Sequence, residues 1–310
     1  MNLLVTGAAG FIGSKLALRL INEGNKVYTL DNLSTGYSEN IPKGVELIEG
    51  NCQDMNIITR LSNMKFDAIV HIAGQSSGEV SFDNPVYDLQ TNTQSTLLLL
   101  EYAKKTGCRK FIFASTMSVY GDSEEQPVKE DFVCKPISFY AIGKLASEQY
   151  LKTYAKFGVQ TISLRLFNVY GPGQNMKNLK QGMVSIYLAQ AIKDRKIWVK
   201  GSGDRYRDLV YIDDVINSFC NAIAFDEPGN HCFNIGSGLS IRVKDIVDSI
   251  KKHFESKLDI VYAGSTPGDM HGICSDSSLA FQKMNWKSKV KFDDGLKHMC
   301  DWSVSSLKKL

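Results

Sequence analysis

A tyrosine and a lysine four residues apart, Tyr140 and Lys144, are the residues of this 310-residue chain best suited to do chemistry. On a helix, residues at this spacing share one face about a turn apart. A phenol has a pKa of about 10, so it is a poor base near neutral pH. A nearby ammonium favours the phenolate, and we therefore expect Lys144 to lower the pKa of Tyr140. The pair predicts a site in which Tyr140 accepts a proton from a substrate hydroxyl.

The segments around this pair alternate between short apolar strands and helical patterns, which is typical of βαβ units and a parallel sheet. We expect strands at residues 3–6, 27–30, 45–49, 68–71, 110–114 and 160–165, and helices at 11–22, 86–106 and 140–157. After Gly171-Pro172-Gly173 the alternation stops, and a second, smaller region is expected to begin. A helix over 213–225 and a strand around Phe233 are expected to return to the first region. The predicted fold is α/β: a Rossmann-type, doubly wound parallel sheet (1–168 with 208–235) and a smaller, C-terminal substrate-binding domain (169–207 with 236–310).

Three glycines lie between the first strand and the first helix, at Gly7, Gly10 and Gly13. Gly7 permits a tight turn, Gly10 lets the backbone approach a pyrophosphate, and Gly13 allows close packing of helix on strand. The N-terminus of the helix then offers N–H groups to phosphate. The spacing Gly-x-x-Gly-x-x-Gly differs from the commonest dinucleotide fingerprint, so an ordinary glycine-rich turn is the alternative.

An acidic residue supports the dinucleotide interpretation. Asp31 follows the second strand, eighteen residues after Gly13, where a carboxylate can accept hydrogen bonds from the adenosine ribose. The same carboxylate would repel a 2′-phosphate, and no arginine follows it, so NAD is favoured over NADP. The alternative is that Asp31 and Asn32 only start a turn.

Composition narrows the functional classes. The formal net charge is +3, and short lysine pairs are better explained as solvated helix faces than as a nucleic-acid surface. The seven cysteines are scattered without Cys-x-x-Cys pairs, which argues against a disulfide framework and a zinc site and favours a reduced cytosol. No signal peptide is evident, and the apolar run 97–100 is too short to span a bilayer. We expect a cytoplasmic protein without metal, membrane or nucleic-acid partner.

Taken in order, several motifs make the chain resemble the extended short-chain dehydrogenase/reductase family, nearest to its nucleotide-sugar epimerases and dehydratases. The motifs are the glycine loop at 6–13, His71–Gln75, Ser115–Gly121, Tyr140-x-x-x-Lys144, Arg165–Pro172, Gly201–Asp208 and Tyr211–Val215. The resemblance extends nearly from end to end of the chain.

The resemblance implies a role for each matching residue. Thr116 would orient the sugar hydroxyl, Tyr140 would take its proton while a hydride leaves for nicotinamide, and Lys144 would hold the nicotinamide ribose and tune Tyr140. Asn168 would contact a nucleotide-diphosphate sugar, and Arg207 would neutralise its diphosphate. The implied cofactor residues are Gly7, Gly10, Phe11, Ile12, Gly13, Asp31, Asn32, Asn51, Ala73, Ser115, Tyr140 and Lys144.

Simpler interpretations of these residues stay open. Thr116 could merely end a strand, Asn168 could be a turn residue, and Arg207 could pair with Asp204 or Asp208. His71 lies near a strand end, where a structural role is more common than a catalytic one.

The chain departs from the family pattern at several positions. Sugar 4,6-dehydratases carry an Asp-Glu pair after the catalytic threonine, but this chain has Met117 and Ser118, so elimination of water is not expected. Many UDP-sugar members carry an arginine two residues before a Gly-Asp pair, and this chain has Thr266 at that position, before Gly268-Asp269. Asp269 is itself an expected substrate residue. Asn51 replaces an aspartate that usually faces adenine, and Glu79 lies in the sugar-contact segment, where it is expected to contact an unusual sugar.

The leading hypothesis is an NAD-dependent nucleotide-sugar 4-epimerase that passes through a 4-keto sugar. The alternatives are a 4-dehydrogenase that releases the keto sugar, with a GDP- rather than a UDP-linked substrate possible, and a non-catalytic NAD-binding regulatory protein. The resemblance also implies a homodimer in which helices 86–106 and 140–157 of two subunits pack as a four-helix bundle. The apolar positions Leu97, Leu98, Leu100, Leu145 and Tyr150 suit such a bundle or an ordinary core.

Overall fold

Strands within residues 2–166 and the later strand 230–235 form a parallel sheet in the computed structural model, which describes residues 1–123, 125–254, 258–265 and 270–307. Within these residues, seven strands are hydrogen-bonded in the order β11-β6-β5-β4-β1-β2-β3, and every neighbouring pair is parallel. The strands are β1 (Asn2–Thr6), β2 (Lys26–Asp31), β3 (Glu46–Glu49), β4 (Ala68–His71), β5 (Lys110–Thr116), β6 (Gln160–Leu166) and β11 (Asn230–Ile235). This is the predicted Rossmann-type sheet, and the strand expected around Phe233 is its edge strand β11.

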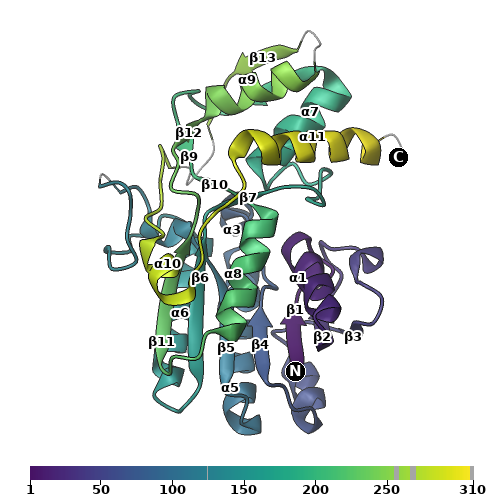
Figure 1. The fold of residues 1–310 in the computed structure, drawn as a ribbon, viewed down its shortest axis with the longest axis vertical. Helices are drawn as coiled ribbons and strands as arrows, with labels where there is room; N and C mark the ends of the chain where they lie inside the picture. The colour runs from purple at the N-terminus through teal and green to yellow at the C-terminus, as the bar shows by residue number, and fades with distance from the viewer. Residues whose placement is uncertain (124, 255–257, 266–269, 308–310) are drawn as a thin grey trace.

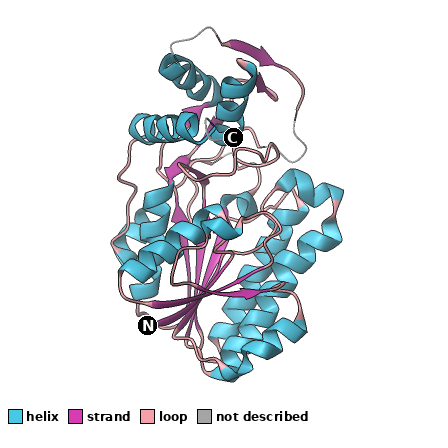
Figure 2. Ribbon diagram, turned by 90° about the vertical axis from the view of Figure 1, so that its right-hand side faces the viewer, coloured by secondary structure: helices cyan, strands magenta, loops and turns pink. Residues whose placement is uncertain are grey.

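Helices cover both faces of the sheet because alternate residues of each strand point to opposite sides. Leu3 and Val5 of β1 pack with α1 and α8, whereas Leu4 packs with α5 and α6. Figure 1 shows α1 and α8 side by side on the near face, and Figure 2 shows the two helical layers around the sheet. The helices of this part are α1 (Phe11–Asn22), α2 (Met55–Arg60), α3 (Gly78–Asp83), α4 (Pro85–Leu89), α5 (Ser95–Thr106), α6 (Phe139–Ala155) and α8 (Ile212–Ala224), with the short 3₁₀ turns η1 (Ser38–Asn40), η2 (Leu61–Asn63) and η4 (Met117–Tyr120).

The helix predicted over 86–106 is continuous but not uniform. Between α4 and α5 the backbone widens into a π-helical segment, η3 (Gln90–Gln94). Such segments are rare and occur frequently at functional sites. This one packs against α6, the helix that carries Tyr140 and Lys144.

The C-terminal part forms a smaller upper lobe of short strand pairs and helices (Figures 1 and 2). Its elements are β7 (Asn168–Tyr170), α7 (Met183–Asp194), β8 (Lys196–Val199), β9 (Tyr206–Arg207), β10 (Leu209–Tyr211), β12 (Ile241–Arg242), α9 (Val243–Phe254), β13 (Asp259–Tyr262) and α11 (Phe292–Leu307). β7 pairs with β10 and β8 with β13 in parallel, and β9 pairs with β12 in antiparallel orientation. The helix α10 (Ser278–Met284) lies outside this lobe and packs beside the edge strand β11 of the sheet (Figure 1).

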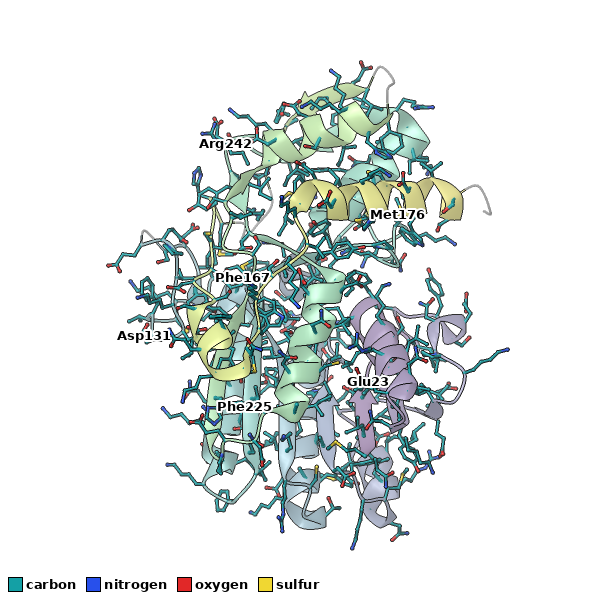
Figure 3. The ribbon with its side chains drawn as sticks, in the orientation of Figure 1. Glu23, Asp131, Phe167, Met176, Phe225 and Arg242 are labelled. Atoms are coloured by element: carbon teal, nitrogen blue, oxygen red, sulfur yellow. The ribbon has the colours of Figure 1, made fainter. Side chains whose placement is uncertain are left out.

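The two parts share a hydrophobic core. The cluster that contains Leu3 and Leu16, on the face of the sheet covered by α1 and α8, also contains Leu188, Ile246 and Met299 of the upper lobe. Phe167 and Met176, labelled in Figure 3, belong to this cluster near the junction of the two parts. The domain boundaries given above therefore stay a prediction, since the core crosses them. Within the described part of the chain, none of the helices is long and apolar enough to cross a membrane.

Candidate active site

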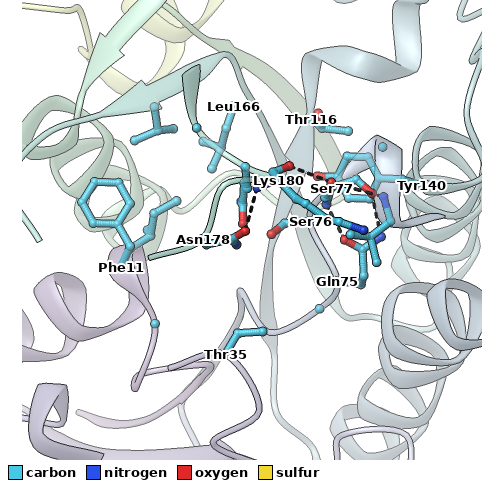
Figure 4. A pocket seen from close by; sticks show the side chains of 18 of the residues that line it. Phe11, Thr35, Gln75, Ser76, Ser77, Thr116, Tyr140, Leu166, Asn178 and Lys180 are labelled. Carbon is cyan, nitrogen blue, oxygen red and sulfur yellow. Dashed lines mark hydrogen bonds between the residues drawn. The ribbon is translucent and has the colours of Figure 1, made fainter. Parts of the chain in front are cut away.

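A cavity of about 740 Å³ opens at the carboxyl ends of the sheet strands, beneath the upper lobe. Its walls come from the β1–α1 turn, the ends of β2, β4 and β5, the start of α6, and residues 168–209 of the upper lobe. This is the edge at which doubly wound sheets bind their ligands. Figure 4 shows Phe11, Thr116 and Tyr140 among the side chains around it.

Thr116, Tyr140 and Lys144 are brought together at one side of the cavity, as the motif order predicts. Thr116 is the last residue of β5 and is buried, and its Oγ1 accepts a hydrogen bond from the Ser118 N–H at 3.1 Å. Ser138 caps α6 by accepting from the Ala141 N–H at 3.2 Å, which fixes where the helix begins. Lys144, one turn after Tyr140, donates to the Ala114 carbonyl oxygen at 2.9 Å.

The expectation that the pKa of Tyr140 lies below its ordinary value because of Lys144 is wrong, since this pKa is raised. Burial raises the pKa of Tyr140 to about 12, a side-chain interaction with Thr116 opposes this rise, and the charge of Asp88 adds to it. Burial also lowers the pKa of Lys144 to about 8. Its ammonium lies 4.6 Å from the centre of the Phe113 ring and 5.8 Å from the centre of the Tyr140 ring. Desolvation of the phenol is therefore the dominant influence on the pKa of Tyr140, which lies above rather than below its ordinary value.

The β1–α1 turn has the geometry of a phosphate-binding loop. Gly7 adopts a φ of +79°, and its N–H donates to the Leu30 carbonyl oxygen at 3.0 Å. A Cβ on Gly13 would lie 2.2 Å from the Gly7 carbonyl oxygen, so only glycine permits this packing of α1 on the turn. Gly10 caps α1 without a side-chain hydrogen bond, and Phe11 and Ile12 line the cavity beside it. The helix N-terminus therefore presents backbone to the cavity, which fits the pyrophosphate of NAD.

Asp31 is the last residue of β2, and its carboxylate lines the cavity. One carboxylate oxygen accepts from the Ala9 N–H at 2.9 Å and the other from the Leu33 N–H at 2.9 Å. Each oxygen keeps a second lone pair, which suits the ribose hydroxyls of NAD. Nearby, the Asn32 side chain donates to Asn51 at 2.7 Å. Asn32 lines the cavity, and contact between Asn51 and adenine stays a prediction.

His71 has the structural role that its position suggests. The Thr6 Oγ1 accepts hydrogen bonds from the N–H groups of Ile72 and Ala73, at 3.1 Å each. The Thr6 hydroxyl can therefore donate its own proton to the Nδ1 of His71, which lies 2.8 Å away. On the other side, His71 Nε2 lies 3.1 Å from the Ser95 hydroxyl, which itself donates to a backbone carbonyl. The ring is therefore a neutral Nε2–H tautomer that fixes the strand end carrying Ala73.

A buried charged network beneath the site was not predicted from the sequence. Glu148 lies one turn after Lys144 and receives two hydrogen bonds from Arg165, at 3.0 and 2.7 Å, and one from the Ser115 hydroxyl, at 2.5 Å. Arg165 also donates to the Tyr120 hydroxyl at 2.9 Å. Since the Ser115 hydroxyl is directed at Glu148, the contact expected between Ser115 and the cofactor would come from its backbone.

Two of the predicted substrate residues lie on the upper-lobe side of the cavity. Asn168, on β7, donates to the Asp208 carbonyl oxygen at 3.1 Å and lines the cavity. Arg207 is buried, and burial together with the charge of Arg205 lowers its pKa to about 10. Two guanidinium groups that line one cavity favour an anionic ligand. The suggested partner Asp204 instead pairs with Lys244 at 3.2 Å.

Asp208, the other suggested partner of Arg207, has a structural role. Its buried carboxylate accepts hydrogen bonds from the backbone and hydroxyls of Ser237 and Ser275 and from the Gly238 N–H, over distances of 2.6 to 3.0 Å. It therefore ties the segment that follows β11 and the segment that precedes α10 to the connection between β9 and β10.

Glu79 lines the cavity, where it is expected to contact the sugar, and it is also ion-paired with Lys200 of the upper lobe at 3.5 Å. A neighbouring contact joins the same two parts of the chain: the Ser77 hydroxyl donates to the Lys180 carbonyl oxygen at 2.9 Å (Figure 4). Thr266 and Asp269 lie outside the described residues, so their predicted relation to the substrate stays a prediction.

Met117 and Ser118 line the cavity at the positions where dehydratases carry acids. Neither side chain is an acid or base near neutral pH, and the expectation that the site does not eliminate water stays a prediction. No group of three or more potential metal-ligating side chains occurs among the residues that the structure describes.

A glycine turn at the head of a Rossmann sheet, an acidic residue at the end of β2 and a Thr-Tyr-Lys cluster over one cavity define an NAD-dependent oxidoreductase of the extended short-chain dehydrogenase/reductase type. The model of the NAD dependent epimerase/dehydratase family matches residues 3–236, and the chain belongs to this family.

Relatives with nucleotide-sugar epimerase names match this chain over nearly their full length. The chain is 32% identical to a putative UDP-glucose 4-epimerase of Methanocaldococcus jannaschii over 97% of each chain. A UDP-glucose 4-epimerase of Thermotoga maritima, solved with UDP-glucose, is 34% identical over 99% of this chain and 100% of that one, with a TM-score of 0.95. The corresponding enzyme of Thermus thermophilus, solved with NAD, is 31% identical with a TM-score of 0.92, over 99% of this chain and all of that one.

Proposed function

We propose that the protein is an NAD-dependent 4-epimerase of a UDP-linked hexose. The observation that carries the proposal is the convergence of Thr116, Tyr140 and Lys144 on a cavity whose far wall holds Asn168 and Arg207. The nucleotide-sugar 4-epimerase names of the relatives support the same reaction and favour UDP over GDP as the carrier.

Each side chain has a defined task in this proposal. Arg207 and Arg205 hold the diphosphate by charge, and Asn168 contacts the nucleotide sugar beside them. Thr116 orients the C4 hydroxyl, and the Tyr140 Oη accepts its proton and later returns one to the same oxygen. NAD, when bound, supplies a hydride acceptor and the positive charge of its oxidised nicotinamide. Lys144 keeps a positive charge beside Tyr140 during both proton transfers.

The experiment is an incubation of the purified protein and NAD with UDP-, GDP- and CDP-hexoses, followed by chromatography of the released sugars. We expect the C4 epimer of a UDP-hexose, formed until both epimers reach equilibrium. Tyr140→Phe should abolish the product, whereas Tyr150→Phe, an exposed tyrosine of the same helix, should retain it. If no sugar gives a C4 epimer and the absorbance of reduced cofactor instead rises in step with a keto sugar, the protein is a dehydrogenase.

The same proposal includes a homodimer. Exposed apolar side chains gather on α3, α4 and α6, with Phe82, Val86, Leu89, Phe139, Ile142 and Tyr150 between 39% and 65% exposed. Among the positions suggested by the sequence, Leu100 is fully buried in the chain's own core, and Leu97, Leu98 and Leu145 pack against it. Val86→Glu should therefore give a monomer in analytical ultracentrifugation, whereas Phe281→Glu, at an exposed apolar position on α10, should leave the dimer intact.

A further inference from the structure

A buried carboxylate with one unpartnered oxygen lies beneath the candidate active site. Asp88, on α4, is 1% exposed. Its Oδ1 accepts hydrogen bonds from Gln75 Nε2 at 2.7 Å and from Asn92 Nδ2 at 3.1 Å. Its Oδ2 is buried and has no hydrogen-bond partner among the described residues. Two amide donors aimed at Oδ1 favour the ionised form, and a buried charge of this kind needs a counter-charge.

The geometry directs this carboxylate at the helix that carries Lys144. A Cβ built on Gly143 would lie 3.5 Å from Asp88 Oδ2, so the carboxylate packs against the residue next to Lys144. The π-helical segment η3 holds α6 at this point: Thr93 donates to the Gly143 carbonyl oxygen at 3.0 Å, and Ser147 donates to the Asn92 carbonyl oxygen at 3.1 Å. The widened turn therefore sets the distance between Asp88 and α6.

Lys144 needs such a partner. Its side chain is 3% exposed, and its ammonium makes a hydrogen bond to the Ala114 carbonyl oxygen and a contact with the Phe113 ring, neither of which carries a charge. An ammonium buried without a counter-ion loses its proton more readily. The nearest acidic residue on its own helix is Glu148, but the Glu148 carboxylate is paired with Arg165 through two hydrogen bonds.

We propose that Asp88 acts as the counter-ion of Lys144 through space, without a direct ion pair: it is a positioning residue that keeps the lysine protonated beside Tyr140. The proposal rests on the role of Lys144 in the proposed catalytic pair. It assigns a function to the unpartnered oxygen and to the widened turn that places it, and neither is part of the motifs that identify the site.

The charges around Lys144 agree in sign with this assignment. Burial lowers the pKa of Lys144 to about 8, and the largest opposing influence is the negative charge of Asp88, followed by that of Glu148. Burial raises the pKa of Asp88, while Gln75, Lys144 and Asn92 lower it. From β4, His71 faces Lys144 as a neutral ring, with a pKa lowered to about 3.

The direct test is a titration of Lys144 in the cofactor-free protein, which does not depend on any substrate. Lysine labelled with ¹³C at Cε reports its charge by NMR, and Lys144→Met identifies the signal. In the unsubstituted protein we expect the titration of Lys144 to have its midpoint at about pH 8, in line with the pKa given above. In Asp88→Asn, which keeps the shape but removes the charge, the midpoint should fall by about one pH unit or more.

Two further variants separate charge from packing. Asp88→Glu keeps the charge and should keep the midpoint at or above that of the unsubstituted protein, whereas a purely structural role predicts that Asp88→Glu disturbs the site more than Asp88→Asn. Glu101→Gln removes a carboxylate from the same helical run, where it contacts Tyr154, and should leave the midpoint unchanged. An unchanged midpoint in folded Asp88→Asn would overturn the proposal.

Two other readouts cover the cases in which a variant does not fold or no epimerase activity is found. In the unsubstituted protein, the ¹³C carboxyl signal of Asp88 should shift at the pH at which Lys144 deprotonates, and no shift there also overturns the proposal. Where epimerase activity is measured, the alkaline limb of its pH profile should move to lower pH in Asp88→Asn. Failure to find a sugar substrate would refute the proposed function but leave the lysine titration valid.

Discussion

The packing of α1 on the β1–α1 turn gives a sharp prediction for the glycine loop. Gly13→Ala places a methyl carbon 2.2 Å from the Gly7 carbonyl oxygen, 2.7 Å from the Gly7 carbonyl carbon and 2.9 Å from the Ala8 Cα. All three are backbone atoms, so no side chain can rotate away. The turn must therefore move by about 1 Å to restore a normal contact.

Little space is available for that movement. The Gly7 N–H is bonded to the Leu30 carbonyl oxygen, and a Cβ on Gly7 would itself lie 2.9 Å from the Ala73 N, so the turn is enclosed between β2 and the end of β4. Overpacking of this kind costs about 1–3 kcal/mol. We expect Gly13→Ala to lower the free energy of unfolding by about 2 kcal/mol and to weaken NAD binding, because the displaced turn carries the phosphate-binding backbone.

Gly10→Ala is the matched comparison. Its Cβ would lie 3.2 Å from the same Gly7 oxygen and otherwise meet open space, so a shift of a few tenths of an ångström accommodates it. Its unfolding free energy should stay within about 0.5 kcal/mol of the unsubstituted value. Its methyl group lies at the cavity wall, so NAD affinity should fall by at least about tenfold, or 1.4 kcal/mol. Urea unfolding without cofactor and calorimetric titration with NAD measure the two effects. A Gly13→Ala protein as stable as Gly10→Ala would refute the reasoning.

Three further perturbations test other parts of the site. Arg165→Met leaves the Glu148 carboxylate buried and unpaired, so urea unfolding should show a loss of about 3–5 kcal/mol, most of it recovered when Glu148→Met is added. Burial lowers the pKa of His71 from 6.5 to about 3, so the unfolded chain binds the extra proton between these values. Stability should therefore decline as pH falls from about 6.5 towards 3, and His71→Gln should flatten the curve in that window. The ultraviolet titration of Tyr140, obtained by subtracting Tyr140→Phe, should have a midpoint near about 12 without cofactor and a lower one with NAD.

The Rossmann half of the molecule could be predicted because its signals are local. Short apolar runs and glycine turns gave the strands to within a residue or two, and α6 begins one residue before Tyr140. The short helices α2 and α3 escaped prediction because six residues carry too little periodicity to stand out. The upper lobe was predicted only as a region, since its two- to four-residue strands pair with distant partners.

For the site residues too, what depends on local signals could be predicted and what depends on tertiary packing could not. Thr116, Tyr140 and Asp31 could be placed because motif and element coincide at those positions. The pairing of Glu148 with Arg165 joins residues seventeen positions apart on different elements, and the burial that raises the pKa of Tyr140 depends on the whole fold. The spacing of residues along the chain predicts neither the partner of a charged side chain nor the extent of its desolvation, because both depend on tertiary packing.

The sign of the Tyr140 shift changes how the pair must work. As folded without cofactor, Tyr140 is a neutral phenol with a pKa of about 12, and Lys144 is an ammonium with a pKa of about 8. The negative charge of Asp88 raises the pKa of Lys144, which favours its ammonium form. The same charge also raises the pKa of Tyr140, which opposes formation of the phenolate. Asp88 and Lys144 together therefore do not make Tyr140 a base at neutral pH. The additional positive charge must therefore come from what occupies the cavity. Within the proposed function, we therefore propose that deprotonation of the sugar hydroxyl is coupled to occupancy by oxidised cofactor, and that Lys144 alone does not make Tyr140 reactive.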